Sequence, residues 1–154
     1  MLIEKDYRGM KATLAYNGIA FSVPENVYII GMMNTADRSL AMIDYALRRR
    51  FSFFEMEPGF NSNGFIQYQQ SLNNETLDEL IERIKELNRE ITMDKSLGKG
   101  FCIGHSYFCG CQKCTEEWMY SIVEYEILPM LNEYWFDDIT KLQRWENILR
   151  GVFQ

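Results

Sequence analysis

The opening segment of the chain alternates short apolar runs with turn-forming residues. Residues 11–16 and 19–23 flank Asn17-Gly18, the pair that best tolerates the positive φ angles of a tight type I′ turn. The sequence therefore predicts a β-hairpin in this segment. Pro24 follows the second run directly and interrupts the strand pattern.

Longer apolar runs follow the hairpin. Residues 27–33 form a continuous, partly β-branched apolar run, which is typical of a strand buried on both faces of a parallel sheet. Residues 39–49 have the spacing of a helix, and residues 51–56 predict another strand. Strand, helix and strand in this order indicate α/β architecture. Because so few strands cannot form a covered sheet, we expect an incomplete sheet and a chain that is a fragment of a longer protein.

The pattern changes to helical spacing after Pro58-Gly59. The mostly polar stretch 61–74 predicts a short helix or a linker. Thr76 and Glu79 have the spacing of a capping box, which marks the start of a strong helix. The apolar positions of that helix recur at helical intervals, and they are Leu77, Leu80, Ile81, Ile84, Leu87 and Ile91.

Further helices are expected towards the end of the chain. An aromatic-rich helix begins near Glu116 and is expected to bend at Pro129, which cannot donate a backbone hydrogen bond. A shorter helix covers about 140–149. The predicted fold class is therefore α/β followed by all-α. Residues 1–58 are expected to form the α/β part and residues 59–154 a small helical domain.

Composition and charge narrow the classes of function. The chain has 154 residues, is 47% hydrophobic and 25% charged, and carries a net charge of −6. This acidic balance argues against a grip on a phosphate backbone by this chain alone, because that contact needs clustered Lys and Arg. The first residues show no signal-peptide pattern, and no apolar run reaches the roughly 20 residues of a membrane helix. All four cysteines lie within residues 102–114, which is poor placement for stapling a secreted fold with disulfides. We therefore expect the protein in a reducing cytoplasm.

Polar residues with possible chemical roles follow the predicted strand 27–33. Asn34, Asp37 and Ser39 come at its carboxyl end, where ligands bind in open α/β sheets. A neutral Asn side chain both donates and accepts hydrogen bonds, so Asn34 could orient a water against a γ-phosphate. The alternative is that these residues only cap or turn into the next helix.

Three consecutive arginines, Arg48, Arg49 and Arg50, come at the end of the predicted helix. The helix dipole favours cations at this position, which is one explanation. The other is an arginine finger, which stabilises a transferring phosphoryl group on a neighbouring molecule and is worth roughly 10³–10⁵ in rate. Consecutive helical residues point in different directions, so one of the three is expected to pack locally.

Several blocks of the sequence together resemble McrB-type AAA+ proteins, the GTP-hydrolysing motor subunits of methylcytosine-specific restriction systems. They are VPENVYIIG at 23–31, MNTADRSL at 33–40, DYALRRRF at 44–51, GKGF at 98–101, IGHSYF at 103–108 and YWFDD at 134–138. The resemblance covers nearly the whole chain. It implies the C-terminal part of an AAA+ module: an incomplete sheet with a β-hairpin, the sensor-1 strand, the arginine-finger helix and a helical lid.

The resemblance also implies roles for particular residues of the first half. Asn34 would be the sensor-1 residue that positions the hydrolytic water, and Asp37 belongs to the signature loop beside it. Arg38 lies in the same loop, and an ion pair between Arg38 and Asp44 would order it. The residues with these implied roles therefore lie at the carboxyl end of the predicted strand or shortly after it.

Two further pairs of residues complete the implied site. Arg49 and Arg50 would be the trans-acting arginines that reach the nucleotide of the next subunit. His105 and Ser106 lie in the implied lid and are candidates for a contact to the nucleotide, although a single histidine is more often a packed, hydrogen-bonded residue.

The implied function is GTP hydrolysis in a homo-oligomeric ring that drives a McrC-type nuclease on methylated DNA. DNA would be bound through regions outside this chain, no membrane is involved, and GTP and Mg²⁺ would be cofactors of the full-length protein. The phosphate loop G-x-x-x-x-G-K-[ST] and the acidic Mg²⁺-binding motif are absent here, so the chain alone is expected to be inactive and without cofactor. Two alternatives stay open: an interaction module that docks on full-length subunits, and part of a generic AAA+ ATPase.

Two interpretations are open for the cysteines, and two for the aromatic residues. Cys102, Cys109, Cys111 and Cys114 fit no common zinc-finger spacing, because C-x₂-C occurs only once, so free thiols are expected and zinc is the alternative. The aromatic residues within 118–136 could stack on bases. Without interleaved basic residues, they are expected in the lid core or in a subunit interface.

Overall fold

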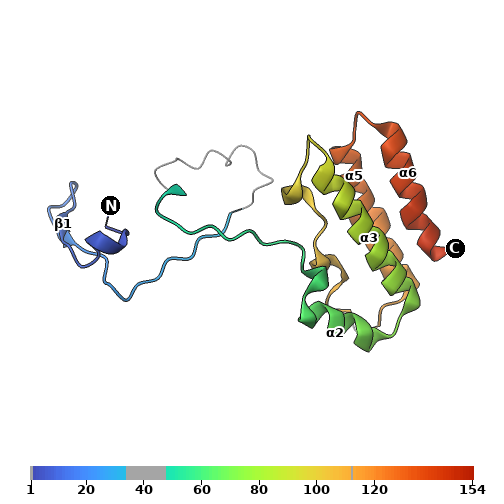
Figure 1. Cartoon of the computed structure of the whole chain (residues 1–154), viewed down its shortest axis with the longest axis horizontal. Helices are drawn as coiled ribbons and strands as arrows, with labels where there is room; N and C mark the ends of the chain where they lie inside the picture. Colours follow the sequence, from blue (N-terminus) through green and yellow to red (C-terminus); the bar gives the residue numbers. More distant parts are fainter. Residues whose placement is uncertain (1, 34–47, 112) are drawn as a thin grey trace. The chain divides into compact units, whose positions relative to one another are not determined.

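The computed structural model describes residues 2–33, 48–111 and 113–154. The chain divides into two compact units, Met1–Phe54 and Glu55–Gln154 (Figure 1). The sequence places the boundary after residue 58, whereas residues 55–58 belong with the second unit in the structure. The predicted helix 39–49 lies mostly outside the described residues.

The first unit contains the predicted hairpin. A 3₁₀ helix, Lys5–Tyr7, precedes strands β1, Ala12–Thr13, and β2, Ala20–Phe21. The strands pair antiparallel, with Ala12 opposite Phe21 and Thr13 opposite Ala20. The prediction of a hairpin is confirmed, and its strands are shorter than the apolar runs suggest.

The turn of the hairpin differs from the predicted type I′ turn. Gly18 has a φ of 70°, but Asn17 is not among the residues with positive φ, and a type I′ turn requires positive φ at both. Gly18 N donates to Leu14 O at 2.9 Å, which closes a longer loop. The Asn17 side chain accepts from Ile19 N at 3.0 Å. Asn17 therefore stabilises the loop through its side chain, which is the other common role of Asn in turns.

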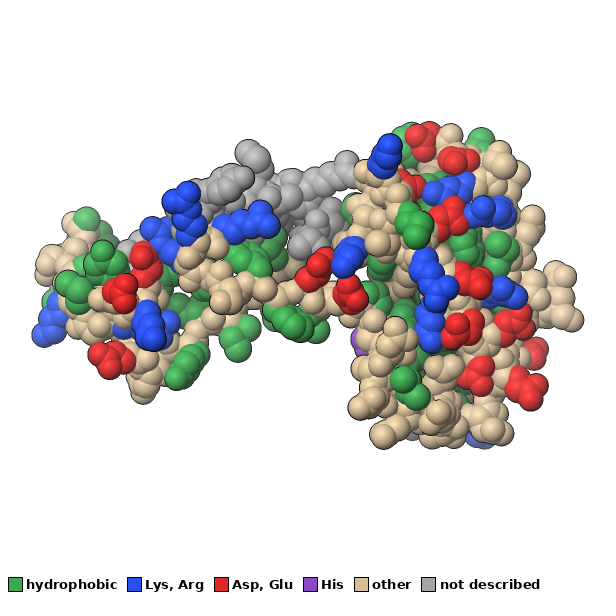
Figure 2. Space-filling model, viewed as in Figure 1, with side chains coloured by type: hydrophobic (Ala, Val, Ile, Leu, Met, Phe, Trp, Pro, Cys, Tyr) green, Lys and Arg blue, Asp and Glu red, His purple; other side chains and the backbone are tan. Residues whose placement is uncertain are grey.

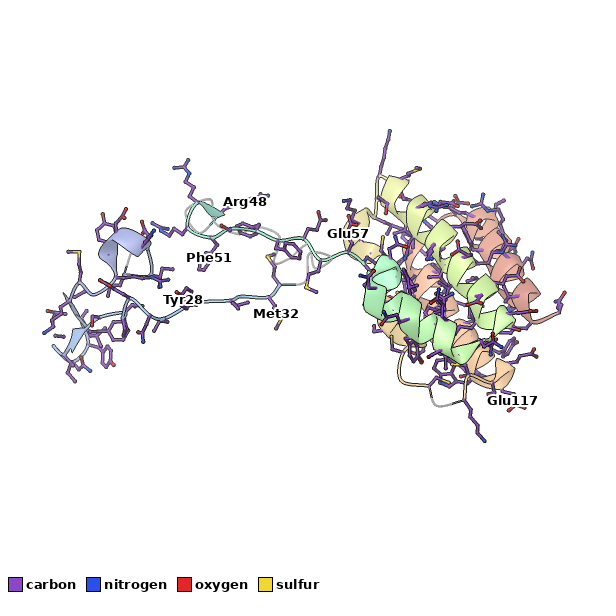
Figure 3. All side chains as sticks on the ribbon, turned by 60° about the horizontal axis from the view of Figure 1, so that its bottom comes forward. Tyr28, Met32, Arg48, Phe51, Glu57 and Glu117 are labelled. Atoms are coloured by element: carbon purple, nitrogen blue, oxygen red, sulfur yellow. The ribbon has the colours of Figure 1, made fainter. Side chains whose placement is uncertain are left out.

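The two further strands predicted for the first unit are not found. Residues 27–33 and 51–56 carry no strand pairing, and their side chains are largely exposed. Figure 3 shows Tyr28 and Met32 as side chains of such an extended segment, and they are 87% and 96% exposed. A central strand needs a hydrogen-bonded neighbour on each side, and the sheet of the described residues consists of β1 and β2 alone. The predicted sensor-1 strand is therefore unpaired in this structure.

The second unit is helical, which confirms the all-α prediction for this part of the chain. Its longer helices are α2, Asn63–Leu72; α3, Glu75–Met93; α4, Glu116–Ile122; α5, Leu128–Tyr134; and α6, Ile139–Arg150. A π-helical segment, Val123–Ile127, joins α4 to α5. Four 3₁₀ turns complete the unit: Gly59–Asn61, Lys99–Phe101, His105–Phe108 and Gly151–Phe153. Helices α3, α5 and α6 lie lengthwise beside one another (Figure 1).

Helix α3 supplies the main apolar stripe of the core. Its six predicted apolar positions are all buried, with at most 1% of any side chain exposed. The start of the helix differs from the prediction, because Asn74 and not Thr76 is the N-cap. Asn74 Oδ1 accepts from Leu77 N at 3.0 Å, and its amide donates to Cys114 O at 2.8 Å. This second bond is long-range, so the sequence pattern around Thr76 does not reveal it.

The structure accommodates Pro129 with the π-helical segment. Leu128 N donates to Val123 O, five residues back, where an α-helix would use the fourth. Pro129 has no N–H, and its ring would clash with the carbonyl of Tyr125 in a regular α-helix. The wider π turn accommodates the proline within one continuous helical segment.

Polar contacts tie the end of α3 to α5 and α6. Asp94 accepts from Trp135 Nε1 at 3.0 Å and from Lys141 Nζ at 2.8 Å. Glu90 accepts from Trp145 Nε1 at 3.0 Å and pairs with Arg144. These bonds satisfy the indole N–H groups of two tryptophans that are otherwise buried in the core. Among the described helices, none has both the length and the apolar character that a membrane span requires.

Candidate functional site

The three arginines of the first unit differ in their surroundings. Arg50 Nε lies 2.7 Å from a carboxylate oxygen of Glu4. The guanidinium carbon of Arg48 lies 5.8 Å from the centre of the Phe53 ring, which is a cation–π distance. Figure 3 shows Arg48 in the turn at the start of the described segment 48–111. Arg49 is exposed, and no ion pair to it is found within the part of the chain that the structure describes.

Arg48 and Arg49 are both exposed, and of the two Arg49 is the one with no local contact among the described residues. The sequence predicts that one arginine packs locally, and the structure provides local contacts for two. Arg50 would have to leave Glu4 to reach another subunit, which would separate a half-buried ion pair. Arg49 has no such contact among the described residues. The geometry therefore distinguishes two residues that the sequence treats alike.

A shallow hollow lies beside Arg50 in the first unit. Its lining is Ile3, Arg8, Tyr28, Ile29, Ile30, Arg50, Phe51 and Ser52. Arg8 donates to the backbone carbonyl oxygens of Ile3, at 3.3 Å, and of Val27. Since Arg50 is held by Glu4, both cations of the hollow already have partners within the unit. The bond to Val27 holds the beginning of the extended segment 27–33 against the start of the chain.

His105 belongs to the second unit and is held on both sides of its ring. Its Nδ1 accepts a hydrogen bond from Gly59 N at 3.0 Å, so Nδ1 carries no proton and the neutral ring has its hydrogen on Nε2. The ring meets Phe65 edge-on, with 5.6 Å between centroids, and Phe60 at 6.1 Å. A Cβ atom at Gly59 would lie 3.0 Å from the ring, so a side chain at this position would press against His105.

The same loop makes a second contact to the start of the unit. Lys99 Nζ lies 2.8 Å from a carboxylate oxygen of Glu57 and 3.9 Å from one of Glu55. This pairing raises the pKa of Lys99 and lowers that of Glu57. His105 and Lys99 together fix the segment through which the chain enters the helical unit. Ser106 follows His105 and is exposed, so its hydroxyl is available to solvent.

Four of the candidate site residues, Asn34, Asp37, Arg38 and Asp44, lie outside the described residues. The remaining candidates fall in different units, Arg49 and Arg50 in the first, His105 and Ser106 in the second. Sequence reasoning missed Glu4 and Gly59 as partners of site residues. Each is separated from its partner by 46 positions, so no local pattern could have identified them.

The cysteines are all reduced in the structure. Cys109 is exposed, and the other three are half-buried. Burial and the neighbouring Cys111 thiol raise the pKa of Cys114 to about 12. Within the described residues, no group of three or more His, Cys, Asp or Glu side chains converges as a metal site would require.

The second unit is a small α-helical domain. Residues 79–143 match the family model described as the McrB alpha-helical lid domain. The chain is also 49% identical over 163 aligned positions to the "Type IV methyl-directed restriction enzyme EcoKMcrB subunit" of Escherichia coli strain K12. That alignment covers 98% of this chain and 36% of the relative, so the chain spans about a third of the relative's length.

These two matches confirm the resemblance to McrB-type proteins. The similarity extends through both units, and it corresponds to the C-terminal part of the McrB subunit. Residues 79–143 of the second unit are the part that is similar to the McrB helical lid domain.

Proposed function

We propose that this chain is the sensor, arginine-finger and lid part of a GTP-hydrolysing AAA+ motor that works as a homo-oligomeric ring. The observation that carries the proposal is the 49% identity to a methyl-directed restriction enzyme subunit over 98% of the chain. In the full-length protein the motor drives a McrC-like nuclease subunit on modified DNA. GTP and Mg²⁺ bind largely through residues outside this chain, because the phosphate loop is not in this sequence.

In this proposal Arg49 is the principal arginine finger. Its exposure and its lack of an ion pair among the described residues support this choice over Arg50. A guanidinium supplied by a neighbouring subunit stabilises the negative charge that spreads over the transferring phosphoryl group. Arg50 then serves mainly to anchor the turn through Glu4, so that Arg49 is presented at a fixed place.

Asn34 and Asp37 contribute the remaining part of the proposed chemistry. Asn34 orients the attacking water, and Asp37, with Arg38 and Asp44, shapes the loop that holds it. His105 contributes by anchoring the lid through Gly59, and only its Nε2–H is left for a nucleotide contact. Ser106 offers an exposed hydroxyl for the same purpose.

The experiment is GTP hydrolysis by the full-length protein carrying Arg49→Ala, with Arg48→Ala as the matched control. We expect Arg49→Ala to lower the turnover rate by roughly 10³ and to leave GTP affinity nearly unchanged, because the arginine acts on another subunit's nucleotide. Arg48→Ala, which removes only the contact to Phe53, should retain most of the activity. Full turnover in the Arg49→Ala protein would contradict the proposal.

A calorimetric titration of the 154-residue chain itself with GTP and Mg²⁺ separates this proposal from a self-sufficient nucleotide site. We expect no detectable heat of binding, since the chain has no phosphate loop to hold the β- and γ-phosphates. Clear binding would mean that the chain contains a nucleotide pocket of its own, which would overturn the assignment.

A further inference from the structure

Acidic residues gather in one part of the helical unit. Residues 55–154 contain 17 Asp and Glu against nine Lys and Arg, and the whole chain carries −6. Between Lys113 and Lys141 there are seven acidic residues and no basic one. This stretch includes α4, the π-helical segment and α5. The excess negative charge of the unit is therefore concentrated on the 116–134 helical segment and the turn after it.

Most of the acidic residues along α3 have a basic partner, although the ion pairs of the described residues include neither Glu75 nor Asp78 of its first turn. On α3, Arg83 pairs with Glu79 and Glu86, and Lys85 pairs with Glu82. Figure 2 shows Lys and Arg side chains interleaved with Asp and Glu on the face that carries α3 and α6. By contrast, the described structure records no ion pair for Glu116 or Glu117 at the start of α4.

A shallow groove lies beside these unpaired carboxylates. It is lined by Glu116, Glu117, Tyr120, Ser121, Tyr125 and Phe153, which we call the α4 groove. Tyr120 is 40% and Tyr125 75% exposed, and the Tyr120 ring meets the Phe153 ring edge-on at 5.6 Å. Figure 3 shows Glu117 at the outer edge of the helical unit. The groove thus combines unpaired negative charge with accessible aromatic faces.

The helix dipole at the start of α4 explains the two carboxylates of the groove but not its exposed tyrosine. The helix dipole favours Glu116 and Glu117 in the first turn of α4, but it does not account for an exposed Tyr125. The π-helical segment includes Tyr125, and π segments recur at functional sites. Arg150 is already held by Glu124 through two hydrogen bonds of 2.9 and 3.0 Å, and the ion pairs of the described residues include none for Lys113, which lies three residues before Glu116. The charge of the groove is therefore not balanced from within the unit.

We propose that the α4 groove binds a basic segment of a partner protein, in which an Arg or Lys side chain lies against Tyr125 and pairs with Glu116 and Glu117. Cations bind favourably over aromatic faces and beside carboxylates, and both are present here within one groove. Nucleic acid is repelled by the same charge. A second helical unit of this chain is also repelled, because it carries the same acidic excess. The groove lies apart in sequence from the residues proposed for GTP hydrolysis, so it can act independently of them.

The test is an NMR titration of the full chain, isotopically labelled, with a short arginine–glycine repeat peptide at low salt. The same peptide with citrulline in place of arginine keeps the shape and removes the charge. We expect the arginine peptide to shift amide signals of α4 and the π-helical segment, and the citrulline peptide to shift none. The double variant Glu116→Gln/Glu117→Gln should weaken binding by about three- to tenfold, as expected for exposed charge pairs. Tyr125→Leu should weaken it by about two- to fivefold through loss of the cation–π contact.

The matched control is Glu133→Gln, which removes an exposed carboxylate of α5 that lies outside the groove. It should leave the affinity for the peptide unchanged. An equal loss in Glu133→Gln would mean that the peptide responds only to the net charge of the unit, and the proposal would fail. It would fail equally if Tyr125→Leu had no effect, or if the shifts fell on α3 and α6. Far-UV circular dichroism of each variant verifies that the helices are intact.

Discussion

Replacement of Asp94 should loosen the attachment of α3 to α5 and α6. The Asp94 side chain is 15% exposed and accepts from Lys141 Nζ at 2.8 Å and from Trp135 Nε1 at 3.0 Å. Trp135 is only 2% exposed, so an indole N–H left without a partner costs about 1–3 kcal/mol. The ion pair with Lys141 adds about 1 kcal/mol, and Glu90 at 3.5 Å retains part of it. We therefore expect Asp94→Ala to lower the free energy of unfolding by about 2–4 kcal/mol.

The conservative variant Asp94→Asn separates charge from hydrogen bonding. Its amide oxygen can still accept from Trp135, but its NH2 group then replaces the oxygen that accepts from Ser96 N at 2.9 Å, so we expect a loss of about 1–2 kcal/mol. The hydrogen bond from Lys141, followed by those from Ser96, holds the pKa of Asp94 well below its ordinary value of 3.8. A lowered pKa in the folded state stabilises the fold above the pKa of the unfolded chain, and this stability is lost as the pH falls. The difference between wild type and Asp94→Asn should thus be full at neutral pH and shrink below about pH 4.

Urea unfolding followed by far-UV circular dichroism measures both effects, because most of the described helices belong to the second unit. The dependence of the unfolding free energy on urea concentration should be the same in all variants. A change in the urea concentration at the midpoint then reports a change in stability. If Asp94→Ala unfolded within about 0.5 kcal/mol of wild type, Asp94 would not tie the helices together as described. A difference for Asp94→Asn that persisted undiminished in acid would refute the ionic part of the argument.

Three further predictions follow from other contacts. Asn74→Ala should lower the free energy of unfolding in urea by about 1–2 kcal/mol, because it removes the cap of α3, whereas Thr76→Ala should lower it by less than about 0.5 kcal/mol. A larger loss for Thr76→Ala than for Asn74→Ala would show that Thr76 is the cap. Gly59→Ala should destabilise the helical unit by about 1–3 kcal/mol because its Cβ would meet the His105 ring at 3.0 Å, and adding His105→Ala should relieve part of that loss; strictly additive costs would speak against the contact. Cys114, with its pKa near 12, should be the slowest thiol to react with iodoacetamide at mildly alkaline pH, as followed by mass spectrometry; early modification of Cys114 would contradict its burial.

The helical part of the fold could be predicted because its signals are local. The spacing of Leu80, Ile84 and Ile91 identifies the buried face of α3 without knowledge of its partners. The effect of Pro129 follows from the absence of its N–H and from its ring, which act within one helical turn. The start of α3 was predicted two residues too late, since Asn74 and Thr76 are both residues that cap helices well.

The sheet could not be predicted in the same way, because a strand depends on its neighbours. Residues 27–33 have the composition of a buried strand, yet the described chain provides no strand beside them. The contacts that hold the site residues are equally non-local. Glu4 meets Arg50, and His105 meets Gly59, across 46 positions of sequence. Only the resemblance to McrB-type proteins assigns these residues to a common function.

The most direct test of the proposed function is a mixing experiment with two full-length variants that are each inactive. One carries Arg49→Ala and an intact phosphate loop, and the other carries Arg49 and a phosphate loop that cannot bind GTP. If Arg49 acts on the nucleotide of the neighbouring subunit, mixed rings place an intact arginine against an intact nucleotide site, and GTP hydrolysis returns on mixing. If the mixture stays inactive at every ratio although the subunits assemble, Arg49 does not act in trans and the central claim is wrong.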